Sequence, residues 1–301
     1  MNAPAERRLL AITLRLFAAI ALTVMFAIVK LVDARGVSLF ESVFYRHAFA
    51  LPLILGWIAA GPGFASVKTA RPGAHVWRSL LGTGGMALNF LTFTLLPLAE
   101  ATVLLFTVPI FATILSSAVL KEQVGSHRWG AVLLGFGGVL IVVQPAGSVL
   151  PTQGVAVGLL AALVVSGVSV TLRQIGRTES ATTTVFWFTI LSTAPMIVLM
   201  PVFGRMHDLE TFGLLIGLGL TGGLAQLALT ASLRLAPVSV VLPMDYSNLI
   251  WSALIGWLVF ATLPGASLWL GAPLIMISGI YIVYREHRLQ RAKIAVAGPA
   301  G

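Results

Sequence analysis

The 301-residue sequence contains no cysteine and few charged side chains. Without cysteine the chain forms no disulfide bond, thiolate metal site or cysteine nucleophile. Asp, Glu, Lys and Arg together make up 10% of the residues, whereas a soluble domain carries about 25%. The hydrophobic share of 58% and the mean hydropathy of +0.98 also exclude a disordered chain, a coiled coil and collagen. These shortages predict an all-α integral membrane protein.

Apolar runs long enough to cross a bilayer, about 20 residues each, recur through the whole chain. Splitting the longer runs at turn residues predicts ten transmembrane helices, at residues 9–31, 39–59, 76–95, 101–120, 129–143, 155–172, 182–203, 212–233, 238–260 and 267–284. Residues 129–172 carry no charge, and the Pro- and Gly-containing segment 144–154 is the predicted turn within them. The first run is too long for the apolar region of a signal peptide, so we interpret it as a retained helix.

The positions of Lys and Arg predict how the chain is oriented. If the N-terminus is cytoplasmic, fifteen of them fall in cytoplasmic segments, three fall outside, and Arg46 remains within a helix. Arg15 and Arg78 are counted among the fifteen. The positive-inside rule therefore predicts a multi-pass protein of the cell inner membrane with both termini cytoplasmic. The net charge of +9 is expected to face anionic lipid rather than nucleic acid, because it lies in short clusters between apolar runs.

The two halves of the chain resemble each other when one is shifted by 137 residues. Residues 81–82, 85, 96 and 98–99 then align with identical residues at 218–219, 222, 233 and 235–236. Five helices in each half is an odd number, so the halves are expected to insert in opposite orientations as a 5+5 inverted repeat. The predicted units are residues 9–145, residues 154–285 and a cytoplasmic tail at 286–301. The alternative is that apolar helices look alike through composition alone.

A longer motif carries a family resemblance. The segment LPLAEATVLLF at 96–106, continued by PIFA at 109–112 and LKE at 120–122, resembles the third-to-fourth helix signature of EamA-type transporters of the drug/metabolite transporter (DMT) superfamily. A second copy begins at LAPVSVVLP, 235–243, and extends to GWLVF, 256–260, where Ala261 and Thr262 replace the usual Gly-Glu pair. The resemblance covers residues 10–285. It implies ten helices, cytoplasmic termini, a central cavity and transport of small metabolites, without naming the substrate.

Three ionisable residues are predicted to lie deep inside the helices, where each costs about 2.5 to 3.5 kcal/mol on insertion scales. They are Glu41, Arg46 and Asp245, and the last two are predicted to lie at similar depth. In a functional interpretation, Arg46 binds an anionic group of the substrate while Asp245 or Glu41 receives an ammonium group or a coupling proton. In a structural interpretation, Glu41 or Asp245 neutralises Arg46. A third possibility is that Arg46 extends to the membrane surface.

Uncharged polar residues supply the remaining substrate-binding candidates. Asn89 and Gln226 lie 137 residues apart and therefore occupy the same position in the two halves. They are predicted to line the cavity or, alternatively, to bond to neighbouring helices. Asn248 follows Asp245 by one helical turn, and Tyr45 precedes the buried arginine.

Proline and glycine predict helix geometry. Pro109, Pro195 and Pro243 fall within predicted helices and are expected to kink them. The many glycines are expected to allow close approach of neighbouring helices.

Taken together, these patterns predict a secondary transporter, either an exporter or an importer, that moves a small polar metabolite such as an amino acid by alternating access. The sequence has no Walker motif, so a solute or ion gradient is the expected energy source, with protons as an optional coupling ion through Glu41 or Asp245. No cofactor, metal or nucleotide is expected. A lipid-linked headgroup flippase is the alternative. A membrane-embedded enzyme is disfavoured because its motifs are missing.

Overall fold

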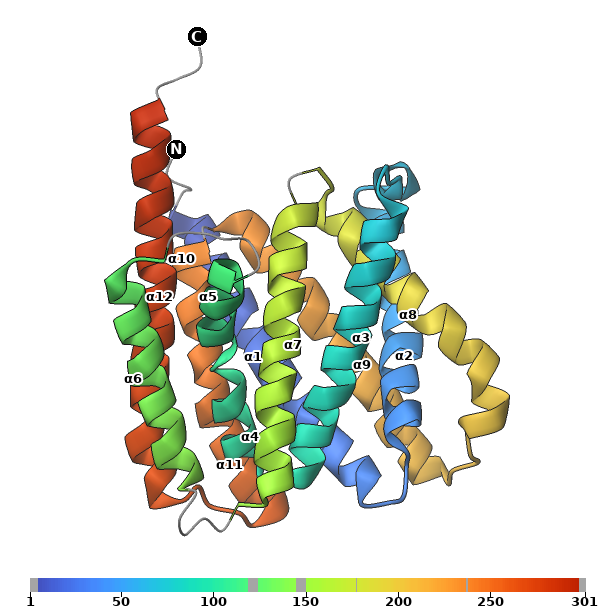
Figure 1. Ribbon diagram of the computed structural model, residues 1–301. Helices are drawn as coiled ribbons and strands as arrows, with labels where there is room; N and C mark the ends of the chain where they lie inside the picture. Colours follow the sequence, from blue (N-terminus) through green and yellow to red (C-terminus); the bar gives the residue numbers. More distant parts are fainter. Residues whose placement is uncertain (1–4, 119–123, 145–149, 177, 237, 298–301) are drawn as a thin grey trace.

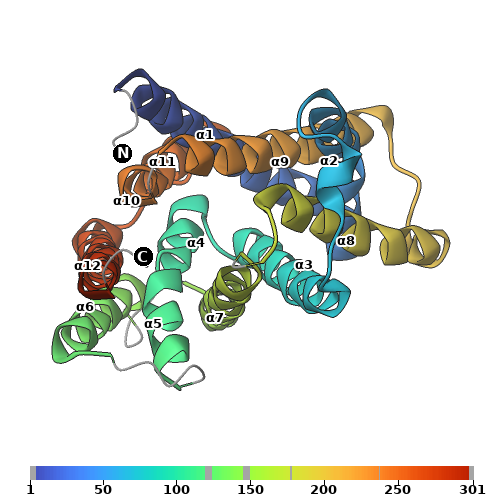
Figure 2. The same ribbon diagram turned by 90° about the horizontal axis from the view of Figure 1, so that it is seen from above.

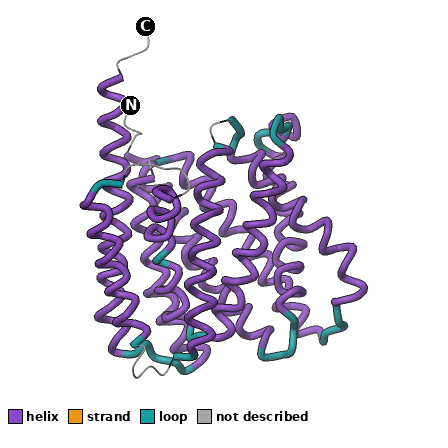
Figure 3. Tube along the Cα trace, viewed as in Figure 1, coloured by secondary structure: helices purple, strands orange, loops and turns teal. Residues whose placement is uncertain are grey.

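A computed structural model describes residues 5–118, 124–144, 150–176, 178–236 and 238–297. All regular secondary structure in these ranges is helical (Figure 3). In chain order the elements are α1 (Ala5–Asp33), α2 (Leu39–Ala60), η1 (Phe64–Val67), α3 (Pro72–Leu95), α4 (Leu98–Leu105), α5 (Val108–Ala118), α6 (Ser126–Val143), α7 (Thr152–Ile175), α8 (Ala181–Phe203), α9 (Leu209–Leu235), α10 (Val238–Val241), η2 (Leu242–Ser247), α11 (Asn248–Phe260) and α12 (Ala266–Ala297).

Eight helical stretches of the described chain are long and apolar enough to cross a membrane, with α4 and α5 counted as one stretch. The chain is therefore an all-α, multi-pass membrane protein. The predicted spans at 76–95 and 238–260 are not among the eight. The second of them is divided into three short elements, of which the longest, α11, has 13 residues. Residues 145–149, in the predicted turn between α6 and α7, lie outside the described ranges.

Two of the predicted spans are broken near a proline, as the sequence indicated. Helix α4 ends at Leu105 and α5 begins at Val108, so Pro109 lies in the first turn after the break. Pro243 lies at the start of η2, between α10 and α11. Proline has no N–H to donate, and its ring collides with the carbonyl four residues earlier, so it does not continue a helix smoothly. Helix α8 runs through Pro195 without interruption.

Small residues let the helices pack closely, as predicted. Helix α1 packs along α9, α3 along α7, and α6 along α12 (Figure 2). A Cβ atom added to Gly138 of α6 would lie 2.8 Å from the carbonyl oxygen of Gly271 of α12. A Cβ atom added to Gly219 of α9 would lie 2.4 Å from the Cβ of Phe49 of α2. Larger residues at these positions would force the helices apart.

The first described turn of α1 and the last turns of α12 lie at the same end of the bundle (Figure 1). We call this the terminal end. Helices α3, α6 and α8 also begin there, whereas α2, α7 and α9 begin at the opposite end, which we call the far end. Adjacent long helices thus alternate in direction.

Candidate functional site: a central cavity

A cavity of about 730 Å³ lies inside the bundle and is walled by residues from both halves of the chain. Apolar side chains form most of its wall, and polar and charged ones interrupt it at a few positions. Its lining includes Arg15 near the start of α1, together with Leu172 and Leu233 near the ends of α7 and α9. These positions belong to the terminal end, so the cavity extends toward that end.

Aromatic rings line the part of the cavity that is nearer the far end. The rings of Phe26 on α1 and Phe93 on α3 stack with their centroids 3.9 Å apart, and Phe90 meets Phe26 edge-on at 6.2 Å. One turn beyond Phe26, the Nζ of Lys30 donates hydrogen bonds of 3.1 to 3.3 Å to three carbonyl oxygens at the end of α3 and just after it. The lysine therefore satisfies unpaired carbonyls of that helix end and holds α1 against α3 behind the rings.

Asp245 is bound by Arg15, which the sequence analysis had counted as a cytoplasmic charge. The Nε and Nη2 atoms of Arg15 donate to the two carboxylate oxygens of Asp245 over 2.6 and 2.5 Å. Both residues line the cavity. The bidentate geometry is the strong form of an arginine–carboxylate pair. It joins α1 to η2 and neutralises both charges within the wall.

Arg46 has no carboxylate partner in the described chain, so its predicted neutralisation by Glu41 or Asp245 is wrong. The side chain is 4% exposed, its Nε has no hydrogen-bond partner, and its Nη1 lies 3.3 Å from Nδ1 of His47. The physical reason is that both carboxylates are held elsewhere. On the neighbouring helix α9, a Cβ atom added to Gly222 would lie 3.1 Å from the Arg46 Nε, so this glycine leaves room for the side chain.

Arg78 is a second buried arginine on the wall, and the sequence analysis missed it. Its guanidinium carbon lies 3.7 Å from the centroid of the Phe188 ring, a cation–π contact. Its Nε and Nη1 have no hydrogen-bond partner. A Cβ atom added to Gly82 would lie 2.3 Å from the Nη1 and 2.8 Å from the ring. A signal existed, because Arg78 lies inside the apolar run at 76–95 and Arg15 lies inside the run at 9–31.

Three of the predicted polar residues line the cavity together with Arg46 and Asp245. Asn89 on α3 has a buried Oδ1 without a hydrogen-bond partner. Gln226 projects into the cavity from α9. Asn248 donates from Nδ2 to the carbonyl oxygen of Asp245 over 2.8 Å, which orients the amide at the start of α11. The cavity thus offers hydrogen-bonding groups from both halves to a polar solute.

Glu41 and Tyr45 lie away from the described cavity lining. Glu41 is fully buried and forms a capping box with Ser38 at the start of α2. Its Oε1 accepts from the backbone N–H of Arg205 over 2.7 Å and lies 2.8 Å from Nε2 of His207. Tyr45 stacks on Phe49 of the same helix and meets a phenylalanine ring of α9 edge-on. Both settings fasten α2 to neighbouring segments near the far end.

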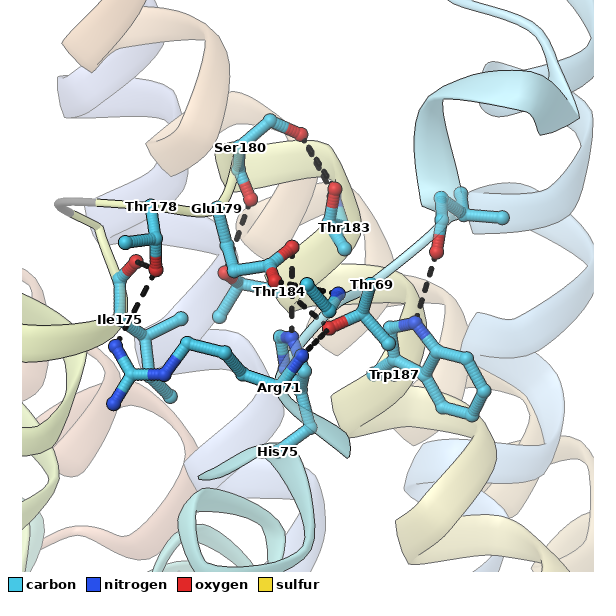
Figure 4. A network of polar contacts seen from close by, with 12 residues as sticks. Thr69, Arg71, His75, Ile175, Thr178, Glu179, Ser180, Thr183, Thr184 and Trp187 are labelled. Atoms are coloured by element: carbon cyan, nitrogen blue, oxygen red, sulfur yellow. Dashed lines mark hydrogen bonds and ion pairs between the residues drawn. The ribbon is translucent and has the colours of Figure 1, made fainter. Parts of the chain in front are cut away.

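A similar carboxylate connects two loops at the terminal end (Figure 4). The Oε1 of Glu179, just before α8, accepts from the hydroxyl of Thr69 over 2.8 Å and from the backbone N–H of Ala70 over 3.1 Å. The Oε2 lies 4.0 Å from Nε2 of His75. Nearby, the indole N–H of Trp187 donates to a carbonyl of η1 over 2.9 Å. Each end of the bundle therefore has a glutamate that joins a loop of one half to a loop of the other.

Comparisons with known proteins agree with this fold. A solved crystal structure superposes with a TM-score of 0.63 at 16% identity, covering 93% of this chain and 98% of that one. Among curated proteins, the riboflavin transporter of Vibrio cholerae serotype O1 is 31% identical over 260 residues, 84% of this chain and 85% of the relative.

Other relatives are named for other substrates. The S-adenosylmethionine uptake transporter of Rickettsia bellii is 26% identical over 255 residues, 85% of this chain and 87% of the relative. The pseudopaline exporter CntI of Pseudomonas aeruginosa is 28% identical over 270 residues, 89% of this chain and 94% of the relative. The EamA-like transporter family matches the chain twice, at residues 9–144 and 152–285. The chain therefore belongs to the EamA-like transporter family and is a small-metabolite membrane transporter of the DMT superfamily, not an enzyme.

Proposed function

We propose that the protein is a secondary transporter that moves a small polar metabolite, such as an amino acid or a related compound, across the cell inner membrane by alternating access. The observation that carries this proposal is the central cavity, which extends toward the terminal end and is lined on its far-end side by the stacked rings of Phe26 and Phe93. Transporters of this type bind solute between two halves and expose it to one side at a time. The sequence has no nucleotide motif, so a gradient drives the movement.

Several features support ten spans arranged as a 5+5 inverted repeat, with units at residues 9–145 and 154–285. The family match occurs twice, once in each unit. Helix α1 packs on α9 and α3 packs on α7, which is one contact repeated with the halves exchanged. The breaks before α5 and at η2 fall at equivalent places in the two units. The loop-joining glutamates, Glu41 in the first turn of α2 and Glu179 just before α8, lie near the starts of corresponding helices but at opposite ends of the bundle.

The charge distribution supports a cytoplasmic location for the terminal end, and with it for the residue 286–301 tail, of which 298–301 lie outside the described ranges. The cavity then opens to the cytoplasm in this state. Asn89, Gln226 and Asn248 are the proposed hydrogen-bonding residues for the solute. Asp245 remains the proposed site for proton coupling, because protonation would release it from Arg15. We assign no transport role to Glu41 or Tyr45.

Solute counterflow in proteoliposomes tests this function. The labelled panel includes amino acids, riboflavin and S-adenosylmethionine, the last two taken from the relatives' names. We expect at least one labelled solute to accumulate inside the vesicles in exchange for unlabelled solute that was trapped there. Asn89→Ala and Gln226→Ala should raise its half-saturation concentration severalfold, whereas the exposed amide variant Gln174→Ala should not. Absence of solute flux combined with transbilayer movement of labelled lipid would contradict the proposal and favour a flippase.

A further inference from the structure

The cavity lining that the structure describes has an unbalanced charge. Four of its residues have guanidinium or carboxylate side chains: Arg15, Arg46, Arg78 and Asp245. The first and the last form an ion pair. The other two arginine residues, 4% and 9% exposed, have no carboxylate partner in the described chain. A buried charge that lacks a counter-charge is costly at membrane depth, which makes it a candidate for function.

The two unpaired arginines belong to one cluster on the wall formed by α2, α3 and α8. Arg46 contacts His47, whose ring meets the edge of Phe188 at a centroid distance of 5.1 Å. The ring of Phe188 also contacts Arg78, whose guanidinium carbon lies 3.7 Å from the ring centroid. Two aromatic side chains therefore connect the guanidinium groups. A single anionic group, or two on one small molecule, bound there would relieve the repulsion between the positive charges.

Glycines preserve the space around both guanidinium groups. Gly82 leaves room for Arg78 and Phe188, and Gly222 leaves room for Arg46. The wall on the far-end side includes the rings of Phe26, Phe90 and Phe93. The cavity therefore combines a cationic region with an apolar, aromatic region. This combination suits a solute that has an apolar body and an acidic group.

We propose that the cavity binds an organic anion, whose carboxylate or phosphate contacts Arg46 and Arg78 while its apolar body packs against the phenylalanine rings. That the anion is carried across the membrane rests on the proposed function. The anion site itself rests only on the two arginines and their surroundings. Arg78 becomes a binding residue, and Asp245 no longer supplies a free site for an ammonium group, because Arg15 occupies it.

The test is thermal unfolding of the full-length protein in nanodiscs with five probes. All five contain a benzene ring and differ in the attached group: phthalate, benzoate, phenyl phosphate, neutral benzamide and cationic benzylamine. We expect the three anions to raise the unfolding temperature, the doubly charged ones most, and the other two to leave it unchanged. Arg46→Gln and Arg78→Gln should each weaken anion binding roughly ten- to hundredfold, the loss of a charge-assisted hydrogen bond. Arg205→Gln, at an exposed position outside the cavity lining, should bind normally.

The ligand-free unfolding temperature of Arg46→Gln separates binding from a structural role, because removing an unpaired buried charge should not lower it. Equal stabilisation by benzamide or benzylamine, unchanged anion binding in both glutamine variants, or no stabilisation by any of the anions would overturn the anion site. Counterflow distinguishes this failure from that of the proposed function. A neutral or cationic solute carried equally well by wild type and Arg46→Gln would leave transport intact and reject the anion. Anion binding without flux of any solute would leave the anion site intact and reject the transport function.

Discussion

Arg15 and the pair Arg46 and Arg78 line the same cavity but have opposite surroundings. Arg15 is matched in both charge and geometry by Asp245, so its charge is neutralised where it lies. The other two have aromatic neighbours and no carboxylate in the described chain. The first arrangement connects α1 of one half to η2 of the other, whereas the second leaves positive charge available to a ligand. The residue type is identical, so the neighbouring side chains decide whether an arginine serves the fold or the solute.

The largest effect on stability is expected where the ion pair is broken. Arg15→Gln leaves the Asp245 carboxylate without its partner inside the wall and should lower the free energy of unfolding by about 2 kcal/mol, measured by thermal unfolding in nanodiscs. The loss stays below that of a fully buried pair because the Asp245 side chain is 34% exposed. The double variant Arg15→Gln with Asp245→Asn should recover most of it. If the double variant is as unstable as the single one, the pair does not hold the halves together.

A smaller effect is expected where space around an unpaired arginine is filled. Gly82→Ala places a methyl group against the Arg78 guanidinium and the Phe188 ring and should cost about 1 kcal/mol while weakening anion binding. Gly84→Ala, two residues along the same helix, meets nothing within 4 Å. The control should gain up to about 1 kcal/mol from higher helix propensity. Equal anion affinity in the two variants would show that the position of Arg78 does not matter for binding.

The smallest change in stability, and one of opposite sign to that of Arg15→Gln, is expected for Arg46→Gln. Replacing an unpaired buried cation by a neutral amide removes a desolvation cost, so the free energy of unfolding should stay constant or rise by about 1 kcal/mol or less. The same thermal unfolding series measures it. A clear loss of stability would mean that Arg46 is a structural residue after all, and the contrast with Arg15 would disappear.

The helices follow from local chemistry and were therefore predictable. Apolar runs of sufficient length marked each long helix, and Pro109 and Pro243 marked the breaks, because backbone hydrogen bonding and steric clashes act within a few residues. The shift of 137 residues indicated Asn89 and Gln226, which do line the cavity. Their role in binding solute stays a prediction.

The partners of the charged residues were not predictable in the same way. Arg15 and Asp245 are 230 positions apart, and their pairing depends on how α1 and η2 meet in space. Depth along each helix wrongly suggested Arg46 as the partner, because depth says nothing about which side of a helix faces which neighbour. Arg15 and Arg78 were counted with the loops although each lies inside an apolar run. An arginine within such a run is itself the signal of a buried site.

The most direct test of a chamber open to the cytoplasm is modification of single cysteines by a membrane-impermeant maleimide. The native chain has no cysteine, so each introduced thiol is unique. Ser169 lies on the cavity wall, and the thiol of Ser169→Cys should react in inside-out vesicles far faster than in right-side-out ones. Met206→Cys, in the 99% exposed position between α8 and α9, should react only in right-side-out vesicles. Reaction of both thiols from the same side of the membrane would contradict the account.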